Sequence, residues 1–135
     1  MMHDVLVVEG DPFLRFAAMD LVEDAGLSGR AVGHAVEALA ILSADTDIRI
    51  MLTSIGMPGS INGLELAKIV HRRWPRIAII VASGASNVTS KSLPPGGTFI
   101  AKPYLPETVI TCLESAASSE LFHASEQYPP RPNAI

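Results

Sequence analysis

The sequence predicts an α/β domain built on a doubly wound parallel sheet of five strands. Five short apolar, β-branched runs recur along the chain, and their near-continuous apolarity is typical of strands that are covered on both faces. Segments of helical period separate these runs, so strand and helix alternate, as in a parallel sheet flanked by helices. The expected strands are residues 5–8, 30–33, 48–53, 77–82 and 98–101.

The first helical segment has clear start and end signals. Asp11 suits the N-cap, Pro12 suits the first helical position, and Gly26 suits the C-terminal cap. The apolar residues between them recur at helical spacing, which predicts one face packed on the sheet. This face consists of Leu14, Ala18, Leu21, Val22 and Ala25.

The later connections differ in their helical signals. A second helix is expected over residues 34–42, and a third from Gly63 to a point before Pro75, because a proline disfavours helix in the residue that precedes it. Residues 86–97 are rich in Ser, Pro and Gly, which predicts one short helical turn followed by loop. The last helix begins at Pro106, and its apolar side consists of Val109, Cys112, Leu113 and Ala116.

Composition limits the domain organisation and the classes of partner. The 135 residues, 48% of them apolar, suit one globular domain over residues 1–118, and the Ser-, Glu- and Pro-containing remainder at 119–135 suits a flexible tail. A net charge of -4 with scattered basic residues disfavours binding to nucleic acid or an anionic membrane. The longest apolar run, 77–82, is too short to span a membrane. The single cysteine and the absence of a signal-peptide pattern favour a cytoplasmic protein.

The candidate site lies at the tips of the predicted strands. In a doubly wound sheet, ligands and reactive groups gather at the carboxyl ends of the strands. Four tips offer polar or otherwise notable residues, which we therefore expect close together. They are Glu9, Gly10 and Asp11 after the first strand, Ser54 after the third, Ala82, Ser83 and Gly84 after the fourth, and Lys102, Pro103 and Tyr104 after the fifth.

Four motifs at these tips, in this order along residues 4–117, resemble the receiver domain of bacterial response regulators: VLVVEGDP, LTSIGMPGSINGLELA, IIVASG and FIAKPY. The string GSINGLELA is similar to that of short, single-domain, chemotaxis-regulator-like proteins of proteobacteria. The resemblance implies a flavodoxin-like receiver fold with strand order 2-1-3-4-5 and a non-enzymatic role in a two-component phosphorelay. It also implies a carboxylate that accepts a phosphoryl group from a phosphohistidine, with Mg²⁺ and a lysine neutralising charge.

The acidic positions of the family are only partly kept. Glu9 matches the first acid of the pair that holds the metal, but Gly10 stands at the second, and Ser54 replaces the phosphoacceptor aspartate. Mg²⁺ prefers a near-octahedral set of oxygen ligands that includes carboxylates, and Glu9 is the only acid left of the three. We therefore expect no metal and no other cofactor. A serine hydrolase is disfavoured, because no histidine falls at a strand tip and the Gly-x-Ser-x-Gly elbow is missing.

The remaining family positions match unevenly. Lys102 and Pro103 match the phosphate-binding lysine and the proline after it, and the peptide bond between them is often cis in the family. Ala82 stands at the hydroxyl switch position with Ser83 one residue later, and Phe99 stands at the switch aromatic.

Structural roles compete with these functional ones. Asp11 is favoured as an N-cap over a metal ligand. Glu9 and Lys102 are expected to form a salt bridge with no catalytic duty left, and Phe99 has a role in core packing as its alternative.

We expect a pseudo-receiver that acts by contact with a protein such as a histidine kinase or a downstream regulator. The contact face would comprise the fourth helical segment, the fifth strand and the last helix, and a homodimer through this face is a further expectation. One alternative is a conventional phosphoryl-accepting regulator. Another, of a different class, is a flavodoxin-like binder of a small ligand, although no phosphate-cradling glycine loop follows the first strand.

Overall fold

The computed structural model describes residues 3–84 and 88–127, with the side chains described up to residue 118. Strands and helices alternate along this part of the chain. In order they are β1 (Val5–Val8), α1 (Pro12–Asp24), β2 (Gly29–Val32), α2 (Ala35–Ala44), β3 (Ile50–Ser54), α3 (Gly63–Arg73), β4 (Ala78–Ser83), the 3-10 turn η1 (Ser90–Ser92), β5 (Thr98–Ala101) and α4 (Pro106–Gln127). No helix in these two ranges is long and apolar enough to cross a membrane.

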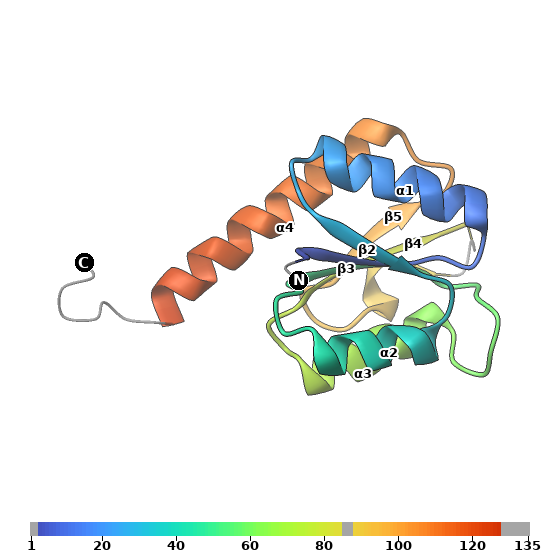
Figure 1. The fold of residues 1–135 in the computed structure, drawn as a ribbon, viewed down its shortest axis with the longest axis horizontal. Coiled ribbons are helices and arrows are strands. Elements are labelled where there is room, and N and C mark those ends of the chain that lie inside the picture. The colour runs from blue at the N-terminus through green and yellow to red at the C-terminus, as the bar shows by residue number, and fades with distance from the viewer. Residues whose placement is uncertain (1–2, 85–87, 128–135) are drawn as a thin grey trace.

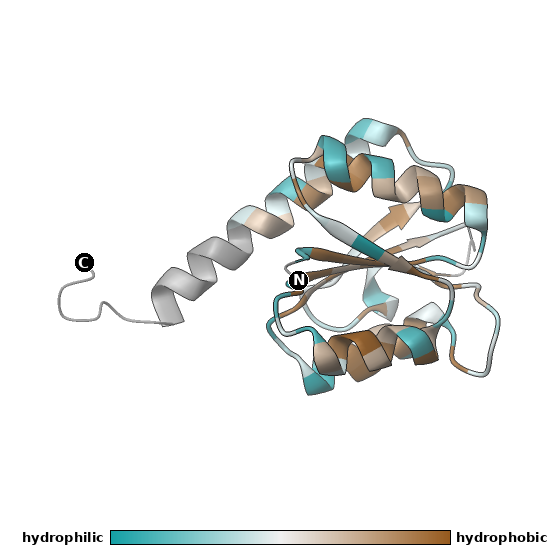
Figure 2. Ribbon diagram, viewed as in Figure 1, coloured by the Kyte–Doolittle hydropathy of each residue, from teal (hydrophilic) through white to brown (hydrophobic). Residues whose placement is uncertain are grey.

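The strands form one parallel sheet in the order β2-β1-β3-β4-β5, as expected. Helices α1 and α4 cover one face of the sheet, and α2 and α3 cover the other (Figure 1). Apolar residues concentrate along the central strands between these layers (Figure 2). The predicted doubly wound fold is therefore confirmed.

Each strand contributes to two cores. Leu6 and Val8 pack with the residues of α2 and α3, whereas Val5 and Val7 pack with those of α1 and α4. All four residues are at most 1% exposed. Apolar side chains are needed on both faces of such strands, which explains the runs without alternation in the sequence.

Local capping sets where the helices begin. The carboxylate of Asp11 accepts hydrogen bonds from the backbone N–H groups of Phe13 (2.8 Å) and Leu14 (3.2 Å), so its predicted role as N-cap is confirmed. A capping box formed by Asn62 and Glu65 starts α3, as their mutual hydrogen bonds of 2.9 and 3.1 Å show.

Gly63 brings the start of α3 against the end of β3. A Cβ atom at this position would lie 1.7 Å from the backbone oxygen of Ser54, so no side chain fits. The Gly63 N–H also donates to the Ile55 backbone oxygen at 2.8 Å. This close approach fixes the backbone that follows Ser54.

Two predicted segments differ in their outcome. The turn η1 confirms the expected short helical turn within 86–97. Helix α4, however, continues through the predicted boundary at Ser118 to Gln127, so residues 119–127 are helical where a flexible tail was expected. These residues include helix-favouring Glu, Leu and Ala, and the first proline after them is Pro129, so nothing local stops the helix earlier. The rest of the predicted tail, 128–135, lies outside the described residues.

Candidate functional site

The tips of β1, β3, β4 and β5 surround a cavity of about 400 Å³. Eight of the residues expected at the strand tips line it, whereas Pro103, Tyr104 and the expected switch aromatic Phe99 do not. The lining residues are Glu9, Gly10, Asp11, Leu14, Ser54, Ile55, Gly56, Met57, Pro58, Ala82, Ser83, Gly84 and Lys102. The structure therefore brings the predicted site together, and it adds the loop of residues 55–58 after β3.

A hydrogen-bonded network of three side chains closes the floor of this cavity. The Lys102 ammonium donates to the Ser54 hydroxyl oxygen at 2.7 Å and to Glu9 Oε1 at 3.0 Å. The Ser54 hydroxyl in turn donates to the same Glu9 oxygen. Glu9 and Ser54 are buried. The negative charge of Glu9 and the positive charge of Lys102 therefore compensate each other largely within the protein. The expected Glu9–Lys102 salt bridge is present.

Both carboxylate oxygens of Glu9 accept protein hydrogen bonds. While Oε1 accepts from Ser54 and Lys102, Oε2 accepts from the backbone N–H of Asp11 at 3.1 Å. The carboxylate of Asp11 is used as the cap of α1 and does not join the network. The cluster is thus one carboxylate, one hydroxyl and one ammonium.

The sheet register holds these groups in place. Ser54 is the last residue of β3 and pairs with Ala82 of β4, and Ser83 of β4 pairs with Ala101 of β5. The Lys102 N–H continues this ladder by donating to the Ser83 backbone oxygen at 2.9 Å. The Lys102–Pro103 peptide bond is cis. Parallel pairing therefore delivers Ser54 and Lys102 to the same edge of the sheet.

The profile of the response regulator receiver domain matches residues 5–114. The chain belongs to this family. Its relatives include the nitrogen assimilation regulatory protein NtrX of Azorhizobium caulinodans, with 32% identity over 120 residues that cover 86% of this chain and 26% of that protein. The chemotaxis protein CheY homolog of Campylobacter jejuni is 30% identical over 86 residues, which cover 60% of this chain and 65% of that protein.

Solved structures show the same fold. NtrX from Brucella abortus has a TM-score of 0.82 at 24% identity over 100% of this chain and 31% of that chain. A CheY-like receiver domain protein from Methanospirillum hungatei has a TM-score of 0.79 at 18% identity over 91% of this chain and 99% of that chain. The receiver described here spans about a quarter of the length of its NtrX relatives.

Receiver domains in general bind Mg²⁺, but the residues of this receiver do not fit the ion. Gly10 supplies no carboxylate, and a Cβ atom there would lie 2.9 Å from Cδ of Pro58, so the loop after β3 fills the space of the second acid. Within residues 3–84 and 88–118, no three His, Cys, Asp or Glu side chains group closely enough to hold a metal. Glu9 alone is a poor ligand set for a cation that prefers six oxygens.

Two aromatic residues of this receiver lie on opposite faces of the sheet. Phe99 is half-buried and packs on the core under α2 and α3, which suits its predicted packing role; its role as a switch stays a prediction. Tyr104 packs on the other core and lines a small internal hollow with Glu9, Ser54 and Lys102. Burial, and then the negative charge of Glu9, raise the pKa of the Tyr104 phenol above its usual value.

Sequence reasoning missed the contribution of Pro58, and it placed Tyr104 at the strand tips without assigning it a role. Pro58 stands inside a quoted motif, but no local pattern tells that it lies against Gly10. The available signal for this contact is a proline close after the third strand combined with a glycine at the second acidic position.

Proposed function

We propose that this chain is a pseudo-receiver, a receiver domain that signals by protein contact without an aspartyl phosphorylation cycle. The observation that carries the proposal is the closed network of Glu9, Ser54 and Lys102 at the phosphoacceptor position. A carboxylate that attacks phosphorus is absent there, and the lysine that would neutralise the incoming group already pairs with Glu9.

Charge makes phosphorylation of the serine itself unfavourable. A phosphoryl group on Ser54 would carry about two negative charges, and it would stand beside the Glu9 carboxylate, to which the serine hydroxyl now donates. At a separation of about 4 Å and an effective dielectric constant of about 20, each pair of like charges costs about 4 kcal/mol. Lys102 offsets part of this cost, but two carboxylates of the family's metal site have been replaced and no metal ion is expected to offset the rest.

The direct test is the mass of the protein after exposure to a phosphoryl donor. Wild-type protein incubated with acetyl phosphate and Mg²⁺, or with a phosphorylated histidine kinase, is expected to keep its original intact mass. A stoichiometric gain of one phosphoryl group that hydroxylamine removes would show an acyl phosphate and would overturn the proposal. A gain that resists hydroxylamine but maps to Ser54 would overturn it as well.

The remaining parts of the proposal concern the context of the domain. The receiver itself extends over residues 1–118, acts in the cytoplasm, needs no cofactor and catalyses no reaction. Its partner is a protein such as a histidine kinase or a downstream regulator. The contact face, which a homodimer would share, comprises η1, β5 and α4.

Two alternatives receive no support from the described residues. A conventional phosphoryl-accepting regulator needs the acids that Gly10 and Ser54 replace. A flavodoxin-like ligand binder shares the fold, but the family match and the network at the strand tips favour a receiver.

A further inference from the structure

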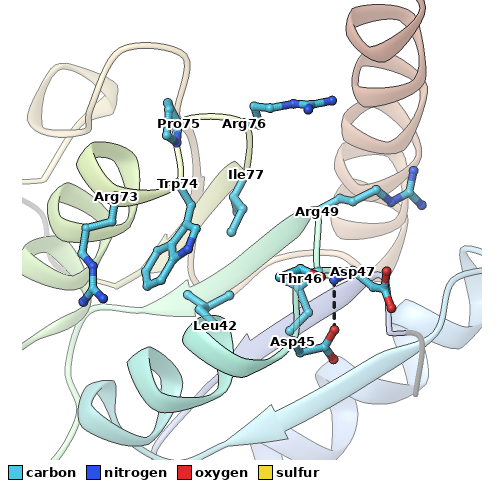
Figure 3. Close-up of a pocket in the computed structure, with 11 residues that line it drawn as sticks. Leu42, Asp45, Thr46, Asp47, Arg49, Arg73, Trp74, Pro75, Arg76 and Ile77 are labelled. Atoms are coloured by element: carbon cyan, nitrogen blue, oxygen red, sulfur yellow. Dashed lines mark hydrogen bonds between the residues drawn. The ribbon is translucent and has the colours of Figure 1, made fainter. Parts of the chain in front are cut away.

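A second cavity, of about 580 Å³, lies at the opposite edge of the sheet from the strand tips. It opens where α2 and α3 end and where β3 and β4 begin (Figure 3). Leu42 and Ile48 form a buried apolar floor, and the half-buried Trp74 and Ile77 form a wall. We refer to this site as the Trp74 groove.

The charged side chains that line the groove carry more positive than negative charge. They are Arg49, Arg73, Arg76, Asp45 and Asp47. An apolar floor with an aromatic wall and a few charged groups at the rim is typical of a binding site. The distribution of these charges indicates which chemistry the groove accepts.

The loop between α2 and β3 contributes charges that are largely compensated. Arg49 donates to Asp4 at 2.9 Å. Asp45 accepts a hydrogen bond from the backbone N–H of Asp47 at 3.0 Å and lies 3.5 Å from Nδ1 of His3. Of the two lining acids, only Asp47 is exposed to solvent.

The turn between α3 and β4 concentrates positive charge beside the aromatic ring. Residues 72–76 read RRWPR, and the three arginines in this segment are exposed. The guanidinium of Arg73 lies over the Trp74 indole at 4.5 Å from the centroid, and Figure 3 shows Leu42 and Ile77 on the other side of the ring. Stacking uses the flat face of the guanidinium, so its N–H edge is still able to donate to a carboxylate.

No acidic side chain of the described residues forms an ion pair with Arg73. Helices α2 and α3 both end at the groove, and the partial negative charge at a helix C-terminus disfavours an anion. The last turn of α3 offsets this effect, because it carries His71, Arg72 and Arg73.

The net charge of -4 on the whole chain does not cancel this local positive charge. At an ionic strength of about 0.1 M, exposed charges separated by more than about 10 Å are largely screened from each other. A carboxylate that approaches Trp74 therefore interacts mainly with the arginines of residues 72–76. Clusters of arginines recognise acidic peptide motifs in the same way.

A peptide complements this groove better than a nucleic acid does. Phosphates follow one another along a nucleic acid strand, so some of them would face the exposed Asp47. A peptide can place its carboxylates beside the arginines and an apolar side chain against Trp74 and Leu42.

We propose that the Trp74 groove binds an acidic peptide segment of a partner protein, with an apolar side chain of the peptide on Trp74 and a carboxylate on Arg73. The groove lies at the opposite end of the domain from the Ser54 network, and it shares no residue with the contact face of η1, β5 and α4. This inference is therefore independent of the proposed function.

Fluorescence of the full-length chain tests the proposal, because Trp74 is the only tryptophan. The probe is an acetylated hexapeptide in which a Leu-Phe pair has two glutamates on each side. Its binding is expected to shift the emission to shorter wavelength and to reduce quenching by acrylamide, since the indole loses contact with water. Peptides with lysines in place of the glutamates, or with Gly-Ser in place of Leu-Phe, should bind at least about fivefold more weakly.

Charge variants locate the binding in the groove. Arg73→Gln should weaken binding of the acidic peptide about fivefold, because one ion pair is lost. Asp47→Asn should strengthen binding, because it removes a like charge from the rim. Asp24→Asn is the matched control: it removes one exposed negative charge from α1, far from the groove, and should leave the affinity unchanged. Far-UV circular dichroism checks that each variant is folded.

Four outcomes would overturn the proposal. The first is the absence of a saturable change in Trp74 fluorescence when the acidic peptide is added to folded wild type. The second is equal affinity for the glutamate and lysine peptides. The third is an equal effect of Asp47→Asn and Asp24→Asn, which would show a response to net charge alone. The fourth is tighter binding of a short oligothymidylate than of the acidic peptide, which would assign the groove to nucleic acid.

Discussion

At the scale of single residues, the Glu9–Lys102 ion pair matters for both stability and function. Glu9 is buried and Lys102 is partly exposed, so removing either charge leaves the other poorly solvated. Lys102→Met is expected to lower the free energy of unfolding by about 1–3 kcal/mol. Glu9→Gln should have a similar effect, and the double variant should lose less than the sum, because the pair is lost as a unit.

Urea denaturation of wild type, both single variants and the double variant measures this coupling. Lys91→Met is the matched control: Lys91 is exposed and its side chain lies outside the network, so the change should stay within about 0.5 kcal/mol. A coupling energy near zero would mean that the network contributes nothing to stability.

The raised pKa of Tyr104 predicts how the stability of the protein changes at alkaline pH. The pKa of its phenol is raised above 10.0 in the folded protein, first by burial and then by Glu9, so the unfolded chain ionises first. Stability is therefore fully present below pH 10 and is lost as the pH rises from there through the folded pKa. As the pH rises above 10, the melting temperature of Tyr104→Phe should fall less than that of wild type. Glu9→Gln should lie between them, since burial is the larger cause. Identical pH profiles for wild type and Tyr104→Phe would contradict this assignment.

Residue chemistry was predictable where it depends on local spacing or on a motif. The Asp11 cap follows from an Asp-Pro sequence before an apolar helical period, and the Glu9–Lys102 contact follows from two strand tips meeting at one edge. The contact of Pro58 with the Gly10 position was not predictable. It depends on the path of a loop between β3 and α3, which propensities do not specify.

At the scale of elements, the junction of β3 and α3 depends on one glycine. Gly63→Ala should destabilise the domain by several kcal/mol or prevent folding, because the added Cβ would lie 1.7 Å from the Ser54 backbone oxygen. Gly56→Ala is the matched control, since a Cβ there meets nothing within 4 Å. Thermal melting of both variants measures the difference. Equal melting temperatures would show that α3 is free to move away from β3.

The elements themselves were predictable to within a few residues, with one exception. Capping residues, prolines and apolar runs gave the expected ranges of α1, α3 and the strands. The end of α4 was not predicted. The sequence after Ser118 contains Ser and Glu and few apolar residues, and this composition indicated a flexible tail. Helix propensity within 119–127 opposes that interpretation, and no proline interrupts the helix before position 129.

At the scale of the whole molecule, the alternation of strand and helix fixes the class of fold, whereas strand order depends on more than pattern. Apolar runs predict a parallel sheet, but the order 2-1-3-4-5 came from the resemblance of four motifs to receiver domains. The placement of all four motifs at one edge is what turns separate residues into a site. The same topology sends α4 from the strand tips back toward the opposite edge of the sheet (Figure 1).

Restoring the family's acids in steps tests the central claim that this receiver has lost its phosphorylation chemistry at identified positions. Ser54→Asp supplies the nucleophile but leaves the metal without its second acid. Adding Gly10→Asp supplies that ligand, yet its Cβ would lie 2.9 Å from Cδ of Pro58, so the loop must shift. Adding Pro58→Ala as well removes the obstacle.

The measurement is the initial rate of phosphorylation by acetyl phosphate with Mg²⁺, followed by intact mass, for wild type and the single, double and triple variants. We expect no reaction of wild type, a slow reaction of Ser54→Asp, and a rate that rises with Gly10→Asp and again with Pro58→Ala. Phosphorylation of the wild type, or a rate of Ser54→Asp alone equal to that of the triple variant, would contradict the account.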